Sequence, residues 1–333
     1  MSGAVFVGGG KNRWLSRPDF SKVAFGSAER FWMIFSDNMR GAFLMMLSMA
    51  AFTLSDASMK SLAAEVPLFQ AVLIRGVITT GLIFLIGMVR GQIRFKFSRS
   101  DWRVVALRTV GEMGATVFFL TALFHMPLAN ISAILQSLPL AITLAGAVFL
   151  GETVGWRRYG AILAGFFGVM LIVRPGVGAF DVYSVYALIA VGFVVLRDLA
   201  TRRLSPEAPS MTVALIAAFA TTMIGAAVTL FSDWQPVSHQ AAISLGLAAG
   251  FIMAGYLLAV MVMRVGEIAF VAPFRYTGLI WAIFLGIFIF DEYPDSLTLI
   301  GSAIVVGMGL YTFYRERKLE RRARRAALGQ SMH

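Results

Sequence analysis

Five ionisable side chains lie inside long apolar stretches, where they could bind a charged solute or carry a proton. They are Asp56, Arg75, Arg108, Glu112 and Arg275. A charged group at the centre of a bilayer costs about 2.5–3.5 kcal/mol on insertion scales, so such groups usually face one another or a polar cavity. Glu112 and Asp56 are therefore candidate proton carriers. Three arginines against two acids favour a ligand with an anionic or electron-rich group.

Two pairs of charges have the spacing of neighbours on one helix face. Asp56 and Lys60 are spaced i,i+4, and so are Arg108 and Glu112. Each pair either neutralises itself and stabilises its own helix, or supplies a functional group. The spacing leaves both alternatives open.

Arg75 has no acidic residue within one turn of its own predicted helix. It follows Pro67 by eight residues, which places it about 12 Å from one membrane surface at a rise of about 1.5 Å per residue. Glu112 follows Arg103 by nine residues on an antiparallel neighbour, about 13 Å from the opposite surface. Across a core of about 30 Å these depths differ by about 5 Å. We expect Arg75 and Glu112 to approach each other near the midplane, where an ion pair could lock the bundle or release Arg75 to an anion.

A second group of residues could contact a flat heterocycle. Arg275 is followed by Tyr276 and Trp281, while Gln136 and Tyr256 lie in other apolar stretches. Guanidinium groups and aromatic rings stack on planar ligands, and an amide can bond to their edges. In the alternative, the aromatic rings anchor the chain at membrane interfaces or, for Trp281 in mid-span, pack against lipid.

The elements that must position these groups are membrane spans. Of the 333 residues, 58% are hydrophobic and 14% are charged, and the mean hydropathy is +0.77, which excludes a water-soluble enzyme. With no cysteine and three scattered histidines, we assign no catalytic residue, metal site or cofactor. The net charge of +11 is concentrated at the termini and in short loops. That distribution favours anionic lipid headgroups over nucleic acid as the partner.

Ten apolar segments have the length of a transmembrane helix, so we expect an all-α polytopic membrane protein. Their limits are 41–59, 68–89, 103–125, 128–150, 156–173, 182–200, 210–231, 240–263, 268–290 and 296–314. Residues 1–38 are predicted as a flexible cytoplasmic arm, and 315–333 as a basic cytoplasmic tail. Lysine and arginine are concentrated in the even-numbered gaps and the tail, and the odd-numbered gaps hold only Lys60 and Arg174. This asymmetry predicts both termini in the cytoplasm, with the spans in a bacterial inner membrane.

The two halves of the chain repeat each other. Phe149-Leu150-Gly151-Glu152 corresponds to Ile289-Phe290-Asp291-Glu292, and Gly146 to Gly286, at an offset of 140 residues (292 − 152). We expect one repeat at 39–176 and another at 177–314. Each holds five spans, so the second repeat is inverted in the membrane. The glycines at 160–168, 246–255 and 301–309 predict closely packed helix faces.

Several motifs resemble the drug/metabolite transporter superfamily, EamA type. They are Leu138-Pro139 through Glu152 to Val173, Arg75, and Ala272-Pro273-Phe274-Arg275-Tyr276-Thr277. The resemblance implies ten helices in two inverted repeats of five, around a central cavity open to one side at a time. It also implies structural roles for Glu152 and Glu292. The segment Ser55–Lys60 looks like that of bacterial members described as S-adenosylmethionine or riboflavin carriers.

The function expected from these features is secondary transport of a small polar or amphipathic metabolite, either amino-acid, nucleoside-like or flavin-like. The alternatives are a polytopic membrane enzyme acting on lipids, and a channel. Such an enzyme needs clustered acids or His with Glu at metal spacing, and Asp291-Glu292 with Asp295 is the acidic cluster available, in an external turn. We therefore expect no enzymatic activity. A monomer and a homodimer both remain open.

Overall fold

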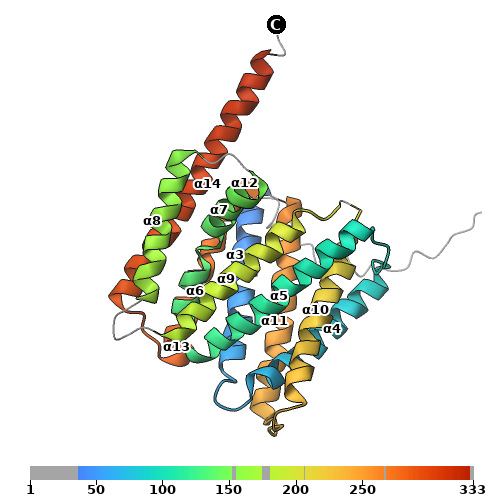
Figure 1. Ribbon diagram of the computed structural model, residues 1–333. Coiled ribbons are helices and arrows are strands. Elements are labelled where there is room, and N and C mark those ends of the chain that lie inside the picture. The colour runs from blue at the N-terminus through green and yellow to red at the C-terminus, as the bar shows by residue number, and fades with distance from the viewer. Residues whose placement is uncertain (1–36, 152–154, 175–180, 206, 266–267, 331–333) are drawn as a thin grey trace, which may run out of the picture.

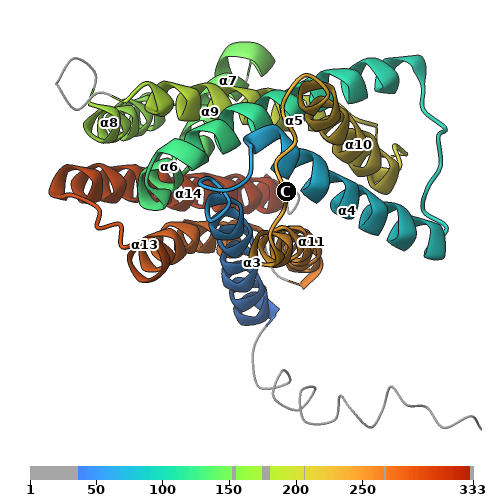
Figure 2. The same cartoon turned by 90° about the horizontal axis from the view of Figure 1, so that it is seen from below.

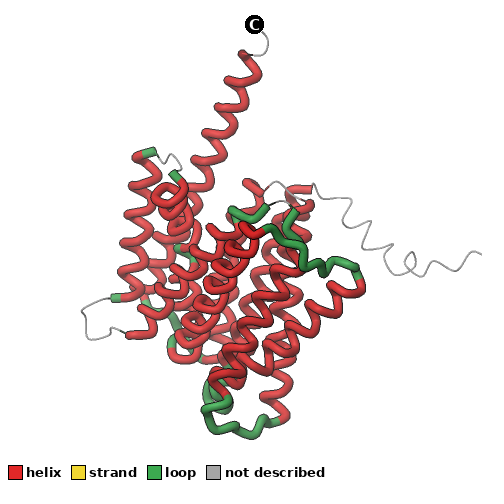
Figure 3. Tube along the Cα trace, turned by 45° about the vertical axis from the view of Figure 1, so that its right-hand side comes forward, coloured by secondary structure: helices red, strands yellow, loops and turns green. Residues whose placement is uncertain are grey.

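The computed structural model describes residues 37–151, 155–174, 181–205, 207–265 and 268–330. Within these ranges every regular element is a helix and no strand occurs (Figure 3). In the part of the chain that the structure describes, ten helical segments are long and apolar enough to cross a membrane. The predicted all-α polytopic fold is confirmed. Most of the predicted N-terminal arm, and Glu152, lie outside the described residues.

The first five spans run in sequence from α3 to α8. Their bounds are α3 Asp37–Lys60, α4 Leu68–Val89, α5 Arg99–His125, α6 Leu128–Leu135 with α7 Leu138–Leu150, and α8 Trp156–Val173. The second five are α9 Val182–Thr201, α10 Ser210–Thr229, α11 His239–Val265, then α12 Ile268–Val271 with η1 Ala272–Tyr276 and α13 Thr277–Phe290, and α14 Ser296–Gln330.

Local sequence signals determine where several helices begin and end. Ser98 caps α5 by accepting the Asp101 N–H at 3.0 Å, which satisfies one of the free donors of a helix start. Pro67 and Pro127 immediately precede α4 and α6. A proline disfavours helical backbone in the residue before it, so neither helix extends further toward the N-terminus. Gly151 ends α7 at φ 68°, a left-handed conformation that glycine adopts without strain. These local signals therefore determine the residues at which the helices begin and end.

The α-helical winding of the fourth and ninth spans is interrupted. The α6–α7 break lies at Gln136 and Ser137, just before Pro139. The corresponding part of the ninth span winds as the 3₁₀ helix η1, which contains Pro273. Proline has no N–H for the helical ladder, so each span changes its winding there. Interrupted helices of this kind commonly occur beside the binding sites of membrane carriers.

Four helix pairs form the framework of the bundle, and each joins one half of the chain to the other. They are α3 with α11, α4 with α10, α5 with α9 and α8 with α14. The end-on view in Figure 2 shows α3 beside α11 and α5 beside α9. If each span of the first half is exchanged for the corresponding span of the second half, α3 is replaced by α9 and α11 by α5. The pair α3–α11 then becomes α9–α5, and the pairs α4–α10 and α8–α14 are each exchanged with themselves. The packing therefore has the pairwise pattern of two related halves.

The backbones of α8 and α14 approach each other closely at two glycines. A Cβ atom on Gly168 would lie 2.8 Å from the carbonyl oxygen of Gly301, and one on Gly301 would lie 2.6 Å from that of Gly168. Gly160, in the same predicted packing run, has nothing within 4 Å of such an atom. The glycine runs thus contain both close contacts and open positions.

The last helix continues well beyond its membrane span. Its apolar window ends at Arg315, but α14 runs on to Gln330. Figure 1 shows it projecting alone past the end of the bundle. The predicted basic tail is thus helical over most of its length.

Candidate functional site: a central cavity

A cavity of about 760 Å³ lies between α4, α5, α10 and α11. It extends from the α4–α5 and α9–α10 connections, at one face of the bundle, to Arg75 in the second turn of α4. Arg75 and Arg90 are 15 residues apart in sequence, which corresponds to about 22 Å along a helix, so the cavity runs along most of α4. Its ionisable and other polar lining residues are Arg75, Thr79, Arg90, Gln92, Arg94, Arg108, Glu112, Thr116, Glu207, Ser210, Thr221 and Tyr256.

Arg75 lies at the deep end of the cavity with an exposed fraction of only 9%. Among the described residues its side chain makes no hydrogen bond and no ion pair within 4 Å. The nearest balancing charges, those of Asp56 and Glu112, act on it at longer range. A guanidinium group that is buried and unpaired is costly to maintain. Arg75 is therefore the strongest single candidate for contact with a ligand.

Glu112 shares the cavity with Arg75, but no ion pair joins the two within the described part of the chain. The Glu112 carboxylate lies instead 3.7 Å from Arg108 Nη2 and 3.6 Å from Arg197 Nη1. Arg108 is on the same helix, α5, and Arg197 is on α9. Arg75 and Glu112 thus line one cavity and lie within electrostatic range of each other. The ion pair that could have joined them is not formed, because α5 packs mainly along α9 and only slightly against α4.

Arg197 is a site residue that the sequence analysis did not single out, because it lies close to the end of the predicted span 182–200. Its Nε also donates to Asp198 at 2.9 Å, so it bridges two acids near the end of α9. A Cβ on Gly111 would come within 2.9 Å of the Arg197 backbone, so a glycine at 111 permits this approach. One feature of the sequence points to such a residue: a carboxylate inside an apolar span, like that of Glu112, needs a cation from a neighbouring helix.

Tyr256 places an aromatic ring among the charged residues around Glu112. It lines the cavity and packs edge-on against Phe52, with centroids 5.3 Å apart and an interplanar angle of 84°. Its hydroxyl lies within electrostatic range of Glu112, Arg197, Arg108 and Arg75. The cavity thus offers an aromatic surface beside its charges.

Four other predicted site residues lie outside the cavity lining. Arg275 is exposed in η1, and Trp281, which is 37% exposed, meets the edge of Phe284. Tyr276 is buried against Phe313 and touches the glycine at 309. Gln136 ends α6 close to Gly278. The reason is that the fourth and ninth spans pack against each other and against α3 and α9, whereas α4, α5, α10 and α11 enclose the cavity.

The predicted Asp56–Lys60 pair is not formed. Lys60 Nζ lies 2.9 Å from Glu292 Oε1 and donates to the Met126 carbonyl at 2.6 Å. Asp56, which does not line the cavity, is half-buried and interacts at longer range with Arg75. Self-neutralisation on one helix is therefore wrong for this pair.

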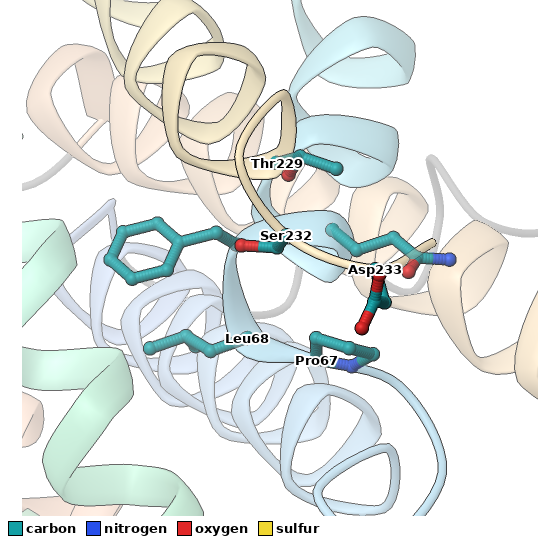
Figure 4. A pocket seen from close by; sticks show the side chains of 7 residues that line it. Pro67, Leu68, Thr229, Ser232 and Asp233 are labelled. Carbon is teal, nitrogen blue, oxygen red and sulfur yellow. The ribbon is translucent and has the colours of Figure 1, made fainter. Parts of the chain in front are cut away.

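The end of the bundle beyond Arg75 is closed by polar contacts between the halves. Gln70 donates to the Gln235 carbonyl at 2.8 Å and accepts the Gln235 N–H at 3.0 Å. Glu65 accepts the Ser238 N–H at 3.2 Å, and Arg174 pairs with Asp295. Beside Gln70 a space of only about 50 Å³ remains, bordered by Pro67, Leu68, Thr229, Ser232 and Asp233 among others (Figure 4). That space is far below the roughly 300–1,000 Å³ of small-molecule sites.

Comparison with known proteins identifies the family. Residues 39–174, which span α3 to α8, match the model of the EamA-like transporter family. The pseudopaline exporter CntI of Pseudomonas aeruginosa strain UCBPP-PA14 is 27% identical over 80% of this chain and 93% of its own length. The first half of this chain, residues 39–174, belongs to the EamA-like transporter family. The chain is accordingly a multi-pass membrane transporter.

Other transporters are similar to this chain over most of its length. The S-adenosylmethionine uptake transporter of Rickettsia prowazekii is 22% identical over 82% of this chain and 92% of its own. The riboflavin transporter of Vibrio cholerae is 27% identical over 65% of this chain and 72% of its own. A solved crystal structure with 20% identity and a TM-score of 0.57 covers 85% of this chain and 99% of that one. That last likeness concerns the fold alone.

Proposed function

We propose that this transporter moves a small polar or amphipathic metabolite by alternating access, and that its cavity here is open to the cytoplasm. The supporting observation is a cavity of about 760 Å³ that holds buried charges, ends at Arg75, and is closed beyond it by contacts between the two halves. The volume suits a molecule of the amino-acid, nucleoside or flavin size class. The relatives are named for pseudopaline, S-adenosylmethionine and riboflavin, which supports the same class.

The inverted repeat supplies the mechanism in this proposal. Residues 39–176 and 177–314 would form two five-helix units related by a pseudo-twofold axis in the membrane plane. The exchange symmetry of the helix pairs supports this relation, as does the repeated sequence around Gly146 and Gly286. Rocking one unit against the other would close the cavity at the α4–α5 face and open it at the Gln70 face.

Orientation follows from the positive charges in this proposal. The arginines at 90, 94, 202 and 203 lie at the face where the cavity begins. Positively charged loops are retained in the cytoplasm, so both termini would lie there in a bacterial inner membrane. The helical basic extension of α14 would lie near anionic headgroups on the same side.

The carrier mechanism is tested by counterflow in liposomes that contain the purified full chain. Liposomes preloaded with one unlabelled metabolite, such as riboflavin or S-adenosylmethionine, are diluted into a trace of the same labelled compound. Transient, saturable accumulation of label is expected for a carrier. Uptake that does not saturate and is not stimulated by preloading would overturn the carrier proposal in favour of a channel. Chemical conversion of the solute would favour the enzyme alternative.

A further inference from the structure

The cavity lining contains polar groups that have no close partner within the described part of the chain. Arg75 is about nine-tenths buried and unpaired within the described residues. Arg108 Nη1 and Thr79 Oγ1 are also buried, with no hydrogen-bond partner in the described structure. All three residues line the same cavity. Native proteins pair nearly all of their buried polar atoms, so three unmet groups in one cavity point to a missing ligand.

The three groups can act on a common ligand. Thr79 follows Arg75 by one helical turn on α4, so their side chains share a face. Arg108 extends from α5, which borders the same space. Arg75, Arg108 and Tyr256 line the same cavity, and both guanidinium groups lie within electrostatic range of the Tyr256 hydroxyl.

The charge of the lining is positive overall. Arg75, Arg90, Arg94 and Arg108 line the cavity, and the acids in the lining are Glu112 and Glu207. Glu112 is already shared by Arg108 and Arg197, so it leaves Arg75 without a close counter-ion. A positive cleft with low-dielectric walls concentrates anions.

We propose that Arg75, aided by Arg108 Nη1 and the Thr79 hydroxyl, binds an oxyanion of the transported metabolite. The oxyanion is a carboxylate or a phosphate, which the planar fork of arginine binds through two parallel hydrogen bonds. The Tyr256 ring then borders the remainder of the molecule. The substrate class is a small organic anion or zwitterion. This inference rests on the proposed transport function and names the chemistry of the same site.

The test compares ligands that differ only in the charged group. Purified full chain in nanodiscs is titrated with glutamate or glutamine, phenylalanine or phenylalaninamide, adenosine monophosphate or adenosine, and inorganic phosphate, at constant ionic strength. The shift of the thermal unfolding midpoint with concentration gives an apparent Kd. The acid of at least one pair is expected to bind about 10- to 100-fold more tightly than its neutral partner, the range of one charge-assisted hydrogen bond. The amino-acid and phosphate arms separate a carboxylate from a phosphate.

Variants link that preference to the site. Arg75→Gln is expected to abolish the acid preference, and Arg75→Lys, which keeps the charge without the fork, to retain part of it. Arg103→Gln is the matched control, because Arg103 is exposed on α5 and outside the lining. If Arg75→Gln unfolds without ligand at a lower temperature, Thr79→Val and Arg108→Gln provide the readout. The same acid preference in wild type and all these variants, or no acid preference in wild type, would overturn the oxyanion site.

The two proposals can fail separately. Counterflow of a neutral metabolite that survives in Arg75→Gln would overturn the oxyanion site and leave transport standing. Acid binding that depends on Arg75, in a protein with no counterflow of the bound compound, would overturn transport and leave the site standing.

Discussion

The Glu292 carboxylate joins the two halves of the chain through Lys60. One of its oxygens lies 2.9 Å from Lys60 Nζ, and the other accepts the N–H of Leu128 at 2.9 Å. The same ammonium bonds to the carbonyls of Met126 and Leu123. One carboxylate thus holds the end of α3, the corner before α6 and the end of α13 together. These contacts lie at the closed face, so we expect them to oppose its opening.

Removing this ion pair is expected to favour opening of the closed face. Lys60→Met leaves the partly buried Glu292 carboxylate without its cation, at a cost of about 1–3 kcal/mol to the closed state. The chain has no cysteine, so a single Thr116→Cys in the cavity can report access. In oriented vesicles, a membrane-impermeant thiol reagent added at the Lys60 face should label this site several-fold faster in Lys60→Met.

The control for this experiment is Lys318→Met, an exposed lysine far along α14. Its labelling rate should match that of the parent. The exchange Lys60→Glu with Glu292→Lys should restore part of the protection, because the ion pair returns but the Leu128 N–H loses its acceptor. Equal labelling in all variants would show that this contact does not hold the face closed.

Proton coupling, if present, is expected to depend on Asp56 more than on Glu112. Glu112 holds Arg108 and Arg197, whereas Asp56 makes no ion pair within 4 Å in the described structure. Protonation of Asp56 therefore breaks no close contact. Asp56→Asn should abolish accumulation driven by a pH gradient but keep counterflow, which moves no net proton. Glu112→Gln should reduce both, because it removes the acid that Arg108 and Arg197 share and leaves Arg197 with Asp198 alone. Gradient-driven uptake that is unchanged in Asp56→Asn would refute this assignment.

The contact between α8 and α14 is expected to tolerate no added methyl group. In Gly168→Ala the new Cβ would press on the Gly301 carbonyl oxygen, so the helices must separate. Overpacking of this kind costs about 1–3 kcal/mol, which a lower thermal unfolding midpoint would reveal. Gly160→Ala on the same helix, with open space around it, should leave the midpoint nearly unchanged or raise it slightly. Equal midpoints for the two variants would contradict the observed packing.

Reporter fusions can test the proposed orientation. Alkaline phosphatase, which folds only outside the cytoplasm, should be inactive when joined after Arg94 or at the C-terminus. It should be active after Gln235, at the opposite end of the bundle. A fluorescent protein at the C-terminus should give the complementary signal. Phosphatase activity at both Arg94 and Gln235 would be incompatible with the predicted spans.

The sequence was sufficient to predict the helices because their determinants are local. Apolar length defines each span, and signals such as Pro67, Pro127 and Gly151 define its ends. The charges Arg75, Arg108 and Glu112 were predicted as site residues because a charged group inside a span needs a polar environment, and all three line the cavity. Their roles in transport remain predictions.

The partners of these charges could not be predicted for a physical reason. A span that is apolar all round gives no indication of which face meets which neighbour. Glu112 meets Arg197, and Lys60 meets Glu292, because α5 packs on α9 and because α3 and α13 end beside each other. For the same reason Tyr276 and Trp281 were assigned to a binding site on residue type alone. They belong to a span none of whose described side chains lines the cavity.

Because α14 is one continuous helix, a small tilt at its base displaces its far end by a much larger distance. Its 35 residues extend about 52 Å, and it touches α8 at Gly301, near its first turn. A tilt of about 10° around that contact would carry the far end sideways by roughly 8 Å, given this length. Small angular changes among the spans would thus become displacements of the basic tip, large enough to be followed by a spectroscopic label near Gln330.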